Sequence, residues 1–191
     1  MEAVLTSFGF QMGDQAEAEL LIEDWARRDF RRIISYCKKA DAFQDIPFSL
    51  DYTYQAVDHS FPRSKFILSV RNSAEEWYQS AINFYTNAVG AGRLPTAEYL
   101  KQFNYRSRPG WLWRTEQLVL GIDETTLWDK SRHISFYIEH NRNVMGYFQH
   151  RPHDLLVLNL GDPSAMLKLC NFLDVPYTGQ LMPHLNRSKD S

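Results

Sequence analysis

The chain has 191 residues, of which 44% are hydrophobic and 23% are charged, a composition typical of an ordered globular protein. A chain of this length usually forms one domain and can bury a full core without disulfides or a metal. With 21 basic and 23 acidic residues, its net charge of −2 argues against a non-specific nucleic-acid binder and against attachment to membranes through basic residues.

The chain also lacks the usual signs of membrane insertion or export. No apolar run approaches the ~18 residues that a membrane span needs, so no membrane partner is expected. The N-terminal segment MEAVLTSFGF has no basic start and no long apolar stretch, so no signal peptide is expected. Cys37 and Cys170 are far apart and read as buried thiols of a reducing compartment, which predicts a cytoplasmic protein.

Apolar spacing in the first part of the chain predicts helices around two strands. Gly9 is expected to end the first helix, and Pro47 to end the first strand. The segment KFILSV is a continuous apolar run, as in a parallel strand that is buried on both faces. Helices are predicted over 1–8, 15–39 and 49–60, and strands over 41–44 and 65–70.

The second part begins with a capping box, Ser73 to Glu76, which predicts a helix to about Val89. Residues 93–130 are rich in aromatic side chains and read as a helical but less regular insertion. A second buried strand is predicted over 154–160. The remaining expectations are a helix over 131–149 with Ile134, Ile138, Val144, Tyr147 and Phe148 on its apolar face, a helix from Pro163 to about Leu173 with Asp162 as its N-cap, and an irregular tail over 174–191.

Strands that alternate with helices, with continuous apolar runs in the strands, predict an α/β fold with a parallel sheet in a single domain over 1–191. Ligands of such sheets bind at the carboxyl ends of the strands. Three segments therefore deserve a search for functional residues: 45–48, 71–80 and 159–164.

Arg71 directly follows the strand at 65–70, and Ser80 lies on the next helix. An arginine and a hydroxyl beside a helix N-terminus would suit a phosphate group. The alternative is that Arg71 pairs with a carboxylate and Ser80 is an ordinary helix serine. Asp45 ends the first predicted strand and could act as a general base, or could simply cap a turn.

Other candidates have equally open alternatives. His140 could point into a cleft from its helix, or could be a structural hydrogen-bonding residue. Trp111 and Trp113 could line an acceptor pocket, or could belong to a hydrophobic core. Histidines and cysteines show no metal-ligand spacing, so no metal is expected. The sequence contains no phosphate-binding glycine loop and no nucleophile elbow.

Six segments between about residue 40 and residue 188 form a recognisable set. The segments are FQDIPF at 43–48, FPRSKFILSVRNSAEEWYQS at 61–80, PGWLW at 109–113, HNRNVMGYF at 140–148, RPHDLLVLNL at 151–160 and PHLNRS at 183–188. The most specific part is FP-x-SKFIL-x-VR followed by WY-x-S. Together, in this order and spacing, these segments resemble the bacterial P-loop sulfotransferases.

The resemblance implies a P-loop NTPase-like architecture with three layers, in which helices flank a parallel sheet. It implies transfer of a sulfuryl group from 3′-phosphoadenosine 5′-phosphosulfate (PAPS) to a hydroxyl or amine of a small-molecule or saccharide acceptor. Arg71 and Ser80 would bind the 3′-phosphate of PAPS, and Asp45 would be the base. Asn186 and Arg187 match a loop near the nucleotide, and the acceptor would lie against the insertion 93–130.

The sequence departs from the family at its start, where the first strand and the P-loop are expected before the first helix. Either the recorded sequence starts at an internal methionine, or the chain is a truncated form; in both cases weak or no transfer is expected of these 191 residues. The alternative function is a non-catalytic nucleotide-binding or oligomerising protein, since an incomplete sheet would expose an edge that a homodimer could cover. A P-loop kinase is disfavoured because no Walker lysine is present.

Overall fold

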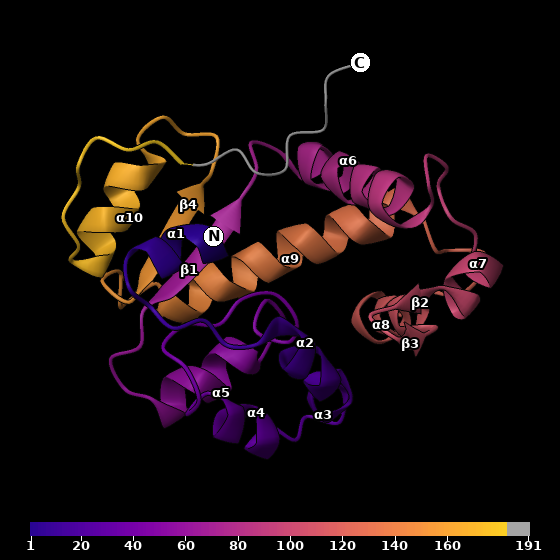
Figure 1. Ribbon diagram of the computed structural model, residues 1–191, viewed down its shortest axis with the longest axis horizontal. Helices are drawn as coiled ribbons and strands as arrows, with labels where there is room; N and C mark the ends of the chain where they lie inside the picture. Colours follow the sequence, from indigo (N-terminus) through magenta and orange to yellow (C-terminus); the bar gives the residue numbers. More distant parts are fainter. Residues whose placement is uncertain (183–191) are drawn as a thin grey trace. The chain divides into compact units, whose positions relative to one another are not determined.

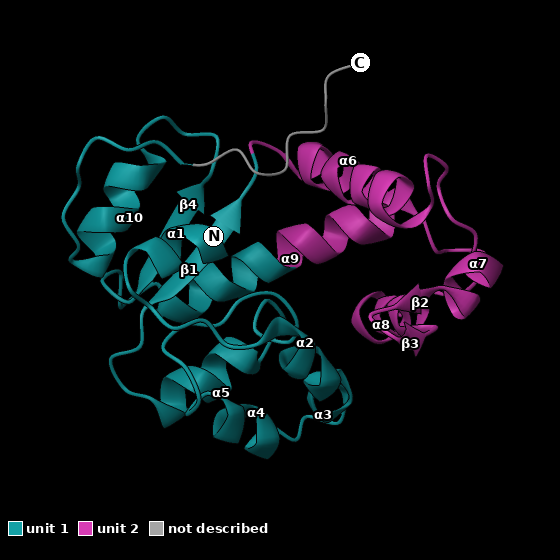
Figure 2. Ribbon diagram, viewed as in Figure 1, with its two compact units in different colours: residues 1–71, 140–191 teal, residues 72–139 magenta. Residues whose placement is uncertain are grey.

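The computed structural model describes residues 1–182 and divides the chain into two compact units (Figures 1 and 2). Unit 1 comprises Met1–Arg71 and His140–Ser191, and unit 2 comprises Asn72–Glu139. The expected insertion 93–130 falls wholly within unit 2. A single domain over 1–191 stays a prediction, as does the assignment of 174–191 as a tail.

Unit 1 is built on a parallel pair of strands (Figure 1). Strand β1 (Phe66–Val70) pairs with β4 (Leu155–Asn159) in a register that sets Phe66 against Leu155 and Val70 against Asn159. Both strands were predicted, and their parallel pairing confirms the α/β class. In the described part of the chain this sheet has two strands.

Helices cover both faces of this sheet, which gives unit 1 three layers. On one face Leu68 packs with Val144 and Phe148 of α9 (Lys130–Phe148) and with Tyr54 of α5 (Thr53–Ser60). On the other face Leu158 packs with α10 (Ala165–Leu173) and with α1 (Glu2–Ser7). Burial of one such large apolar side chain contributes about 2 kcal/mol.

The expected burial of β1 on both faces is wrong in part. Leu68 is buried, but Ser69 is exposed, and Val157 of β4 is 41% exposed. The strand is a continuous apolar run, yet the helices cover only part of each face. A continuous apolar run shows that a strand can be buried on both faces. The extent of its burial depends on the helices that pack against it.

The N-terminal region contains shorter helices than the sequence predicts. Helix α1 ends as expected before Gly9, which has a φ of 90°. The single helix expected over 15–39 is wrong, because Arg28 adopts a left-handed conformation with φ of 58° and interrupts it. The region instead forms α2 (Gln15–Ala18), a 3₁₀ turn (Glu19–Leu21), α3 (Ile22–Ala26) and α4 (Arg31–Tyr36).

Three other boundaries differ from the sequence-based expectation. The strand expected over 41–44 is wrong: Ala42 makes only an isolated parallel bridge with Met12. The helix expected from residue 49 begins at Thr53, after a series of turns. Asp162 is not the N-cap of α10; that position belongs to Ser164, whose N–H and hydroxyl both donate to the Asp162 carboxylate.

Unit 2 begins with the predicted capping box, in which Ser73 Oγ accepts from the backbone N–H of Glu76. Helix α6 (Ala74–Phe84) continues as a π-helical turn (Tyr85–Val89) and ends at Gly90, close to the predicted end. Residues 93–130 are more regular than expected. They form α7 (Ala97–Gln102), a hairpin of β2 (Asn104–Tyr105) and β3 (Arg108–Pro109), and α8 (Trp111–Leu120).

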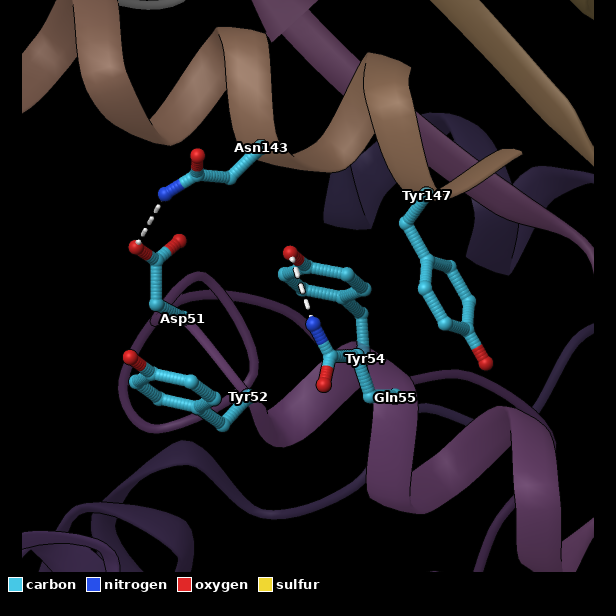
Figure 3. Close-up of a pocket in the computed structure, with 6 residues that line it drawn as sticks. All are labelled: Asp51, Tyr52, Tyr54, Gln55, Asn143 and Tyr147. Atoms are coloured by element: carbon cyan, nitrogen blue, oxygen red, sulfur yellow. Dashed lines mark hydrogen bonds between the residues drawn. The ribbon is translucent and has the colours of Figure 1, made fainter. Parts of the chain in front are cut away.

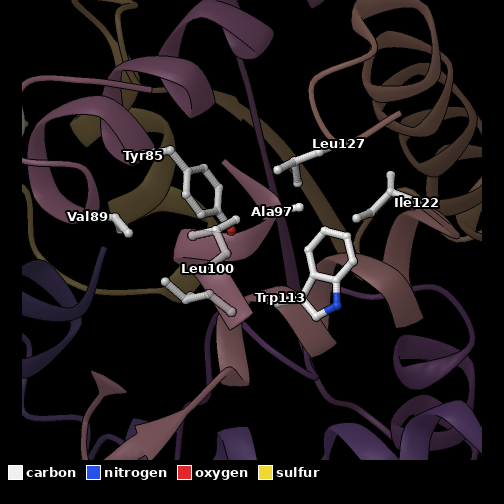
Figure 4. Packing of buried hydrophobic residues seen from close by; sticks show 8 residues of the cluster. Tyr85, Val89, Ala97, Leu100, Trp113, Ile122 and Leu127 are labelled. Carbon is white, nitrogen blue, oxygen red and sulfur yellow. The ribbon is translucent and has the colours of Figure 1, made fainter. Parts of the chain in front are cut away.

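A hydrophobic core fills unit 2 (Figure 4). It consists of buried side chains from the π-helical turn after α6, from α7, from α8 and from the loop after α8. Figure 4 shows Trp113 among them rather than at a surface. The buried members are Tyr85, Val89, Ala97, Leu100, Leu112, Trp113, Ile122 and Leu127.

The long helix α9 was predicted with nearly its observed bounds, but its buried side differs. His133, Tyr137, Val144 and Phe148 are buried, whereas Ile138 is 50% exposed. The expectation that Ile138 lies on the covered face is therefore wrong. None of the helices in the described chain is both long and apolar enough to span a bilayer.

Candidate functional site

The carboxyl ends of β1 and β4 lie at the same edge of the sheet, because the strands are parallel and Val70 faces Asn159. Arg71 follows β1 directly and is exposed there. After β4, Asn159 Oδ1 accepts from the N–H of Gly161 at 2.9 Å, which closes a tight turn. An exposed guanidinium at this edge matches the place where α/β sheets bind ligands.

The acid of the turn after β4 is engaged within the turn itself. Asp162 accepts a hydrogen bond from Lys168 at 2.5 Å, and its other oxygen accepts from Ser164. These donors, Lys168 first, hold the pKa of Asp162 below its ordinary value. The carboxylate therefore stays ionised and has a structural role in this turn.

Ser80 is half-buried on α6, in unit 2, whereas Arg71 ends a segment of unit 1. Near the start of α6, Asn72 donates to the Glu76 carboxylate at 2.8 Å, and Glu76 itself donates its N–H to Ser73. Each residue is described within its own unit. The convergence of Arg71 and Ser80 on one phosphate stays a prediction.

Asp45 lies in a turn rather than at the end of a strand. It is exposed, has a φ of 57°, and its carboxylate accepts from the N–H of Ile46 at 3.0 Å. Its carbonyl accepts from the N–H of Ser49 at 2.7 Å. This is the turn-capping alternative that the sequence left open, and the role of a general base stays a prediction.

A pocket of about 350 Å³ lies within unit 1, between the start of α5 and the C-terminal half of α9 (Figure 3). The segment before and at the start of α5 supplies a carboxylate, two phenols and an amide. Helix α9 supplies an amide and a third phenol. The lining residues are Asp51, Tyr52, Tyr54, Gln55, Asn143 and Tyr147.

Asp51 joins this pocket to α9 through two hydrogen bonds. His140 Nδ1 lies 2.7 Å from one carboxylate oxygen, and Asn143 donates to the other at 3.1 Å. Burial alone would raise the pKa of Asp51, but the hydrogen bonds from His140 and Asn143 outweigh it and the net pKa is below the ordinary value. Asp51 therefore contributes an ionised carboxylate to the wall of the pocket. His140 lies beside the pocket and is not one of its lining residues.

A second acid–base pair, Asp58 and Arg151, lies beside Tyr147 of the pocket lining. Arg151 makes two hydrogen bonds with Asp58, at 3.0 and 2.7 Å, and Tyr147 donates its hydroxyl to Asp58 at 2.7 Å. The hydrogen bond from Arg151 is the main reason why the pKa of Asp58 lies below its ordinary value. This network fixes the Tyr147 ring against the pocket.

Only His140 of this cluster was singled out from the sequence. A usable signal was present: His140, Asn143 and Tyr147 follow each other at spacings of three and four, which places them on one face of a helix. No comparable signal marked Asp51, because it lies in turns before α5. Its approach to α9 depends on the tertiary fold.

The predicted acceptor tryptophans are part of the packing of unit 2. Trp113 is buried in the core, with Lys101 Nζ 5.1 Å from its ring centre. Trp111 is half-buried and stacks on Tyr105 at 5.2 Å. Neither lines the pocket of about 600 Å³ that lies beside Trp128. Their role toward an acceptor stays a prediction beside this structural one.

Two predicted donor-binding residues, Asn186 and Arg187, lie outside the described residues. Within residues 1–182, no group of three or more His, Cys, Asp or Glu side chains is arranged to hold a metal ion. Cys37 and Cys170 are both free thiols; Cys170 is buried as predicted, but Cys37 is only half-buried.

The fold defines an α/β protein with polar side chains at the carboxyl ends of its parallel strands. A family model described as a sulfotransferase domain matches residues 9–191, nearly the whole chain. The chain therefore belongs to the sulfotransferase domain family, which confirms the resemblance at that level. Searches of curated proteins and of solved structures returned no match.

Proposed function

We propose that the chain transfers a sulfuryl group from PAPS to an acceptor hydroxyl or amine, at a low rate. The observation that carries the proposal is the sulfotransferase family match over residues 9–191. In this reaction the acceptor oxygen or nitrogen bonds to sulfur, and the bond from sulfur to the 5′-phosphate oxygen breaks. The acceptor loses a proton, and 3′-phosphoadenosine 5′-phosphate leaves.

The proposed donor site is at the carboxyl edge of β1 and β4. Arg71 would bind the 3′-phosphate, because a guanidinium forms strong, paired hydrogen bonds with phosphate oxygens. Ser80, Asn186 and Arg187 are the further proposed donor ligands. Asp45 is the proposed base for the acceptor proton, and it can serve if the proton moves only in the transition state.

A titration with 3′-phosphoadenosine 5′-phosphate followed by calorimetry tests the donor site. We expect Arg71→Ala to weaken binding by about tenfold or more, as the loss of hydrogen bonds to a charged group does. Arg27→Ala is the matched control, because it removes the same charge from a side chain that is 71% exposed and makes only a surface ion pair. If the nucleotide does not bind, or if both variants bind like the parent, the donor site is not at Arg71.

One structural feature favours a second candidate, a non-catalytic or oligomerising member of the family. Among the described residues the sheet of unit 1 has two strands, and unpaired strand edges can pair with another copy. Light scattering and the release of 3′-phosphoadenosine 5′-phosphate from PAPS separate the two. A stable dimer without release favours this candidate, and a monomer with release rules it out. Both candidates are compatible with a cytoplasmic location, which the two free cysteines favour.

A further inference from the structure

The pocket between α5 and α9 has a chemistry that suits a ligand other than the nucleotide. An ionised Asp51 in its wall disfavours phosphate or sulfate groups. We propose that this pocket binds a saccharide ring.

The tyrosine rings supply the apolar part of such a site. Tyr52 is 48% exposed and Tyr147 is 37% exposed, so both keep ring surface that faces solvent. Arginines cover one face of each ring: Arg28 lies 4.5 Å from the centre of Tyr52, and Arg151 lies 5.2 Å from that of Tyr147. The rings are thereby held in place, and their remaining surface can pack against the C–H face of a sugar ring.

The charges around the pocket compensate one another. Asp51 is hydrogen-bonded to His140, and Asp58 is paired with Arg151. The charged groups that an ionic ligand could bind are thus already paired with each other. A cationic ligand would have to displace His140 or Arg151 from its aspartate. A neutral ligand pays no such desolvation of charge, so the pocket favours neutral over ionic ligands.

The polar groups of the lining fit hydroxyls in particular. Gln55 lines the pocket and donates to the hydroxyl of Tyr54 at 3.3 Å (Figure 3), so its carbonyl oxygen can act as an acceptor for a ligand. Asp51 accepts two hydrogen bonds, although a carboxylate can accept about four. A ring with several hydroxyls both donates and accepts, and can satisfy these groups together. The volume of about 350 Å³ suits one ring, at the lower end of small-molecule sites.

Saturation-transfer NMR with the full chain tests the site directly and needs no donor. The probes are methyl β-D-glucopyranoside, N-acetylglucosamine and maltose, with 2-naphthol and benzyltrimethylammonium as competing chemistries. We expect transfer to ring protons of at least one saccharide. Tyr52→Asn and Gln55→Leu should each weaken it about fivefold.

The variants are chosen so that the fold survives. Tyr52 has a φ of 69°, a conformation that Asn tolerates better than most residues. The matched control is Tyr177→Ala, which removes a tyrosine that is 41% exposed and lies outside the pocket. Thermal unfolding of each variant verifies that it is folded.

The outcomes separate this inference from the proposed function. The site is supported if the saccharide shows a saturation-transfer signal that the two pocket variants reduce and the control variant does not. No saccharide signal, a signal that the variants leave unchanged, or binding of only 2-naphthol or the ammonium probe overturns it. If the chain binds the saccharide but does not bind 3′-phosphoadenosine 5′-phosphate, the saccharide site is supported and the proposed sulfuryl transfer is rejected.

Discussion

His140 Nδ1 lies 2.7 Å from the carboxylate of Asp51, although 89 positions separate the two residues in the chain. The contact connects α9 to the turn that precedes α5. The same turn is held from the other side by Trp25, whose indole N–H donates to the Asp51 carbonyl at 2.8 Å. The wall of the pocket is therefore fixed by three segments of unit 1, which favours a preformed site over one assembled on binding.

Asp51→Asn should destabilise the chain in a pH-dependent manner. The folded pKa of Asp51 lies below its ordinary value, so its contribution to stability is present above about pH 4 and is lost as pH falls through the folded pKa. We expect a cost of about 1–2 kcal/mol in the free energy of unfolding at pH 7. Urea unfolding of variant and parent at pH 7 and pH 3 measures it. A difference that is equal at both pH values would contradict the assignment.

Arg151→Lys should cost far more than the same change at Arg31. Both arginines make two hydrogen bonds to an aspartate. The two pairs differ in burial: the side chain of Asp58, the partner of Arg151, is 10% exposed, whereas that of Asp29, the partner of Arg31, is 36% exposed. A lysine cannot reproduce the paired geometry, and exposed pairs contribute little. We expect Arg151→Lys to lower the denaturant midpoint of unfolding clearly and Arg31→Lys to leave it nearly unchanged. Equal losses would show that burial of Asp58 does not matter.

Strands and long helices were predictable because their apolar spacing is a local property. The segments that became β1, β4 and α9 carry continuous or periodic apolar runs, and the structure retains them. The helix expected over 15–39 failed because Arg28, with no local signal for a break, turns left-handed. Its guanidinium lies 4.6 Å from the Trp25 ring centre and 4.5 Å from that of Tyr52. Such a contact between distant segments is invisible to periodicity.

The candidate site residues likewise divide into those marked by a local sequence signal and those that only tertiary contacts bring together. The position of Arg71 could be predicted because it follows an obvious strand, and a parallel pair places it at the expected edge; its role toward a donor stays a prediction. The pocket beside α9 was missed, and only the neighbouring His140 was singled out, because Asp51 and Tyr52 of its lining lie in turns whose course is set by tertiary contacts. The roles predicted for Ser80 and Asp45 depend on a bound donor and acceptor, and remain predictions.

Gly146→Ala should stabilise the chain, whereas Gly90→Ala should destabilise it. Gly146 lies inside α9, and a Cβ there would meet nothing within 4 Å. A Cβ at Gly90 would lie 1.8 Å from the carbonyl oxygen of Arg93. We expect a gain of about 0.5–1 kcal/mol for the first and a loss of about 2–3 kcal/mol for the second, from thermal or denaturant unfolding. A Gly146→Ala variant that loses stability would contradict the open surroundings of this position.

Both thiols should react slowly with a thiol reagent in the folded chain. Burial raises the pKa of Cys37 to about 11, so little thiolate is present at pH 8. Cys170 has no exposed surface. Labelling by Ellman's reagent should therefore require unfolding, and adding urea should release both thiols together. Rapid labelling of one thiol without urea would contradict this, and Cys37→Ser and Cys170→Ser identify which thiol reacts.

Asp45→Asn tests the proposed base without disturbing the turn that holds it. Asn tolerates the left-handed φ of 57° at this position, and its amide oxygen can still accept from the N–H of Ile46. Removal of a general base lowers the rate typically by about 10²–10⁴-fold. We expect a loss of that order in the release of 3′-phosphoadenosine 5′-phosphate from PAPS, with N-acetylglucosamine as the acceptor probe.

Asp41→Asn is the control for this change, because it removes the same charge from an exposed residue four positions earlier. The affinity for 3′-phosphoadenosine 5′-phosphate should stay unchanged in both variants, since neither residue is proposed to bind the donor. If the Asp45→Asn variant retains the parental rate, Asp45 is not the base, and its role is only to cap the turn in which it lies.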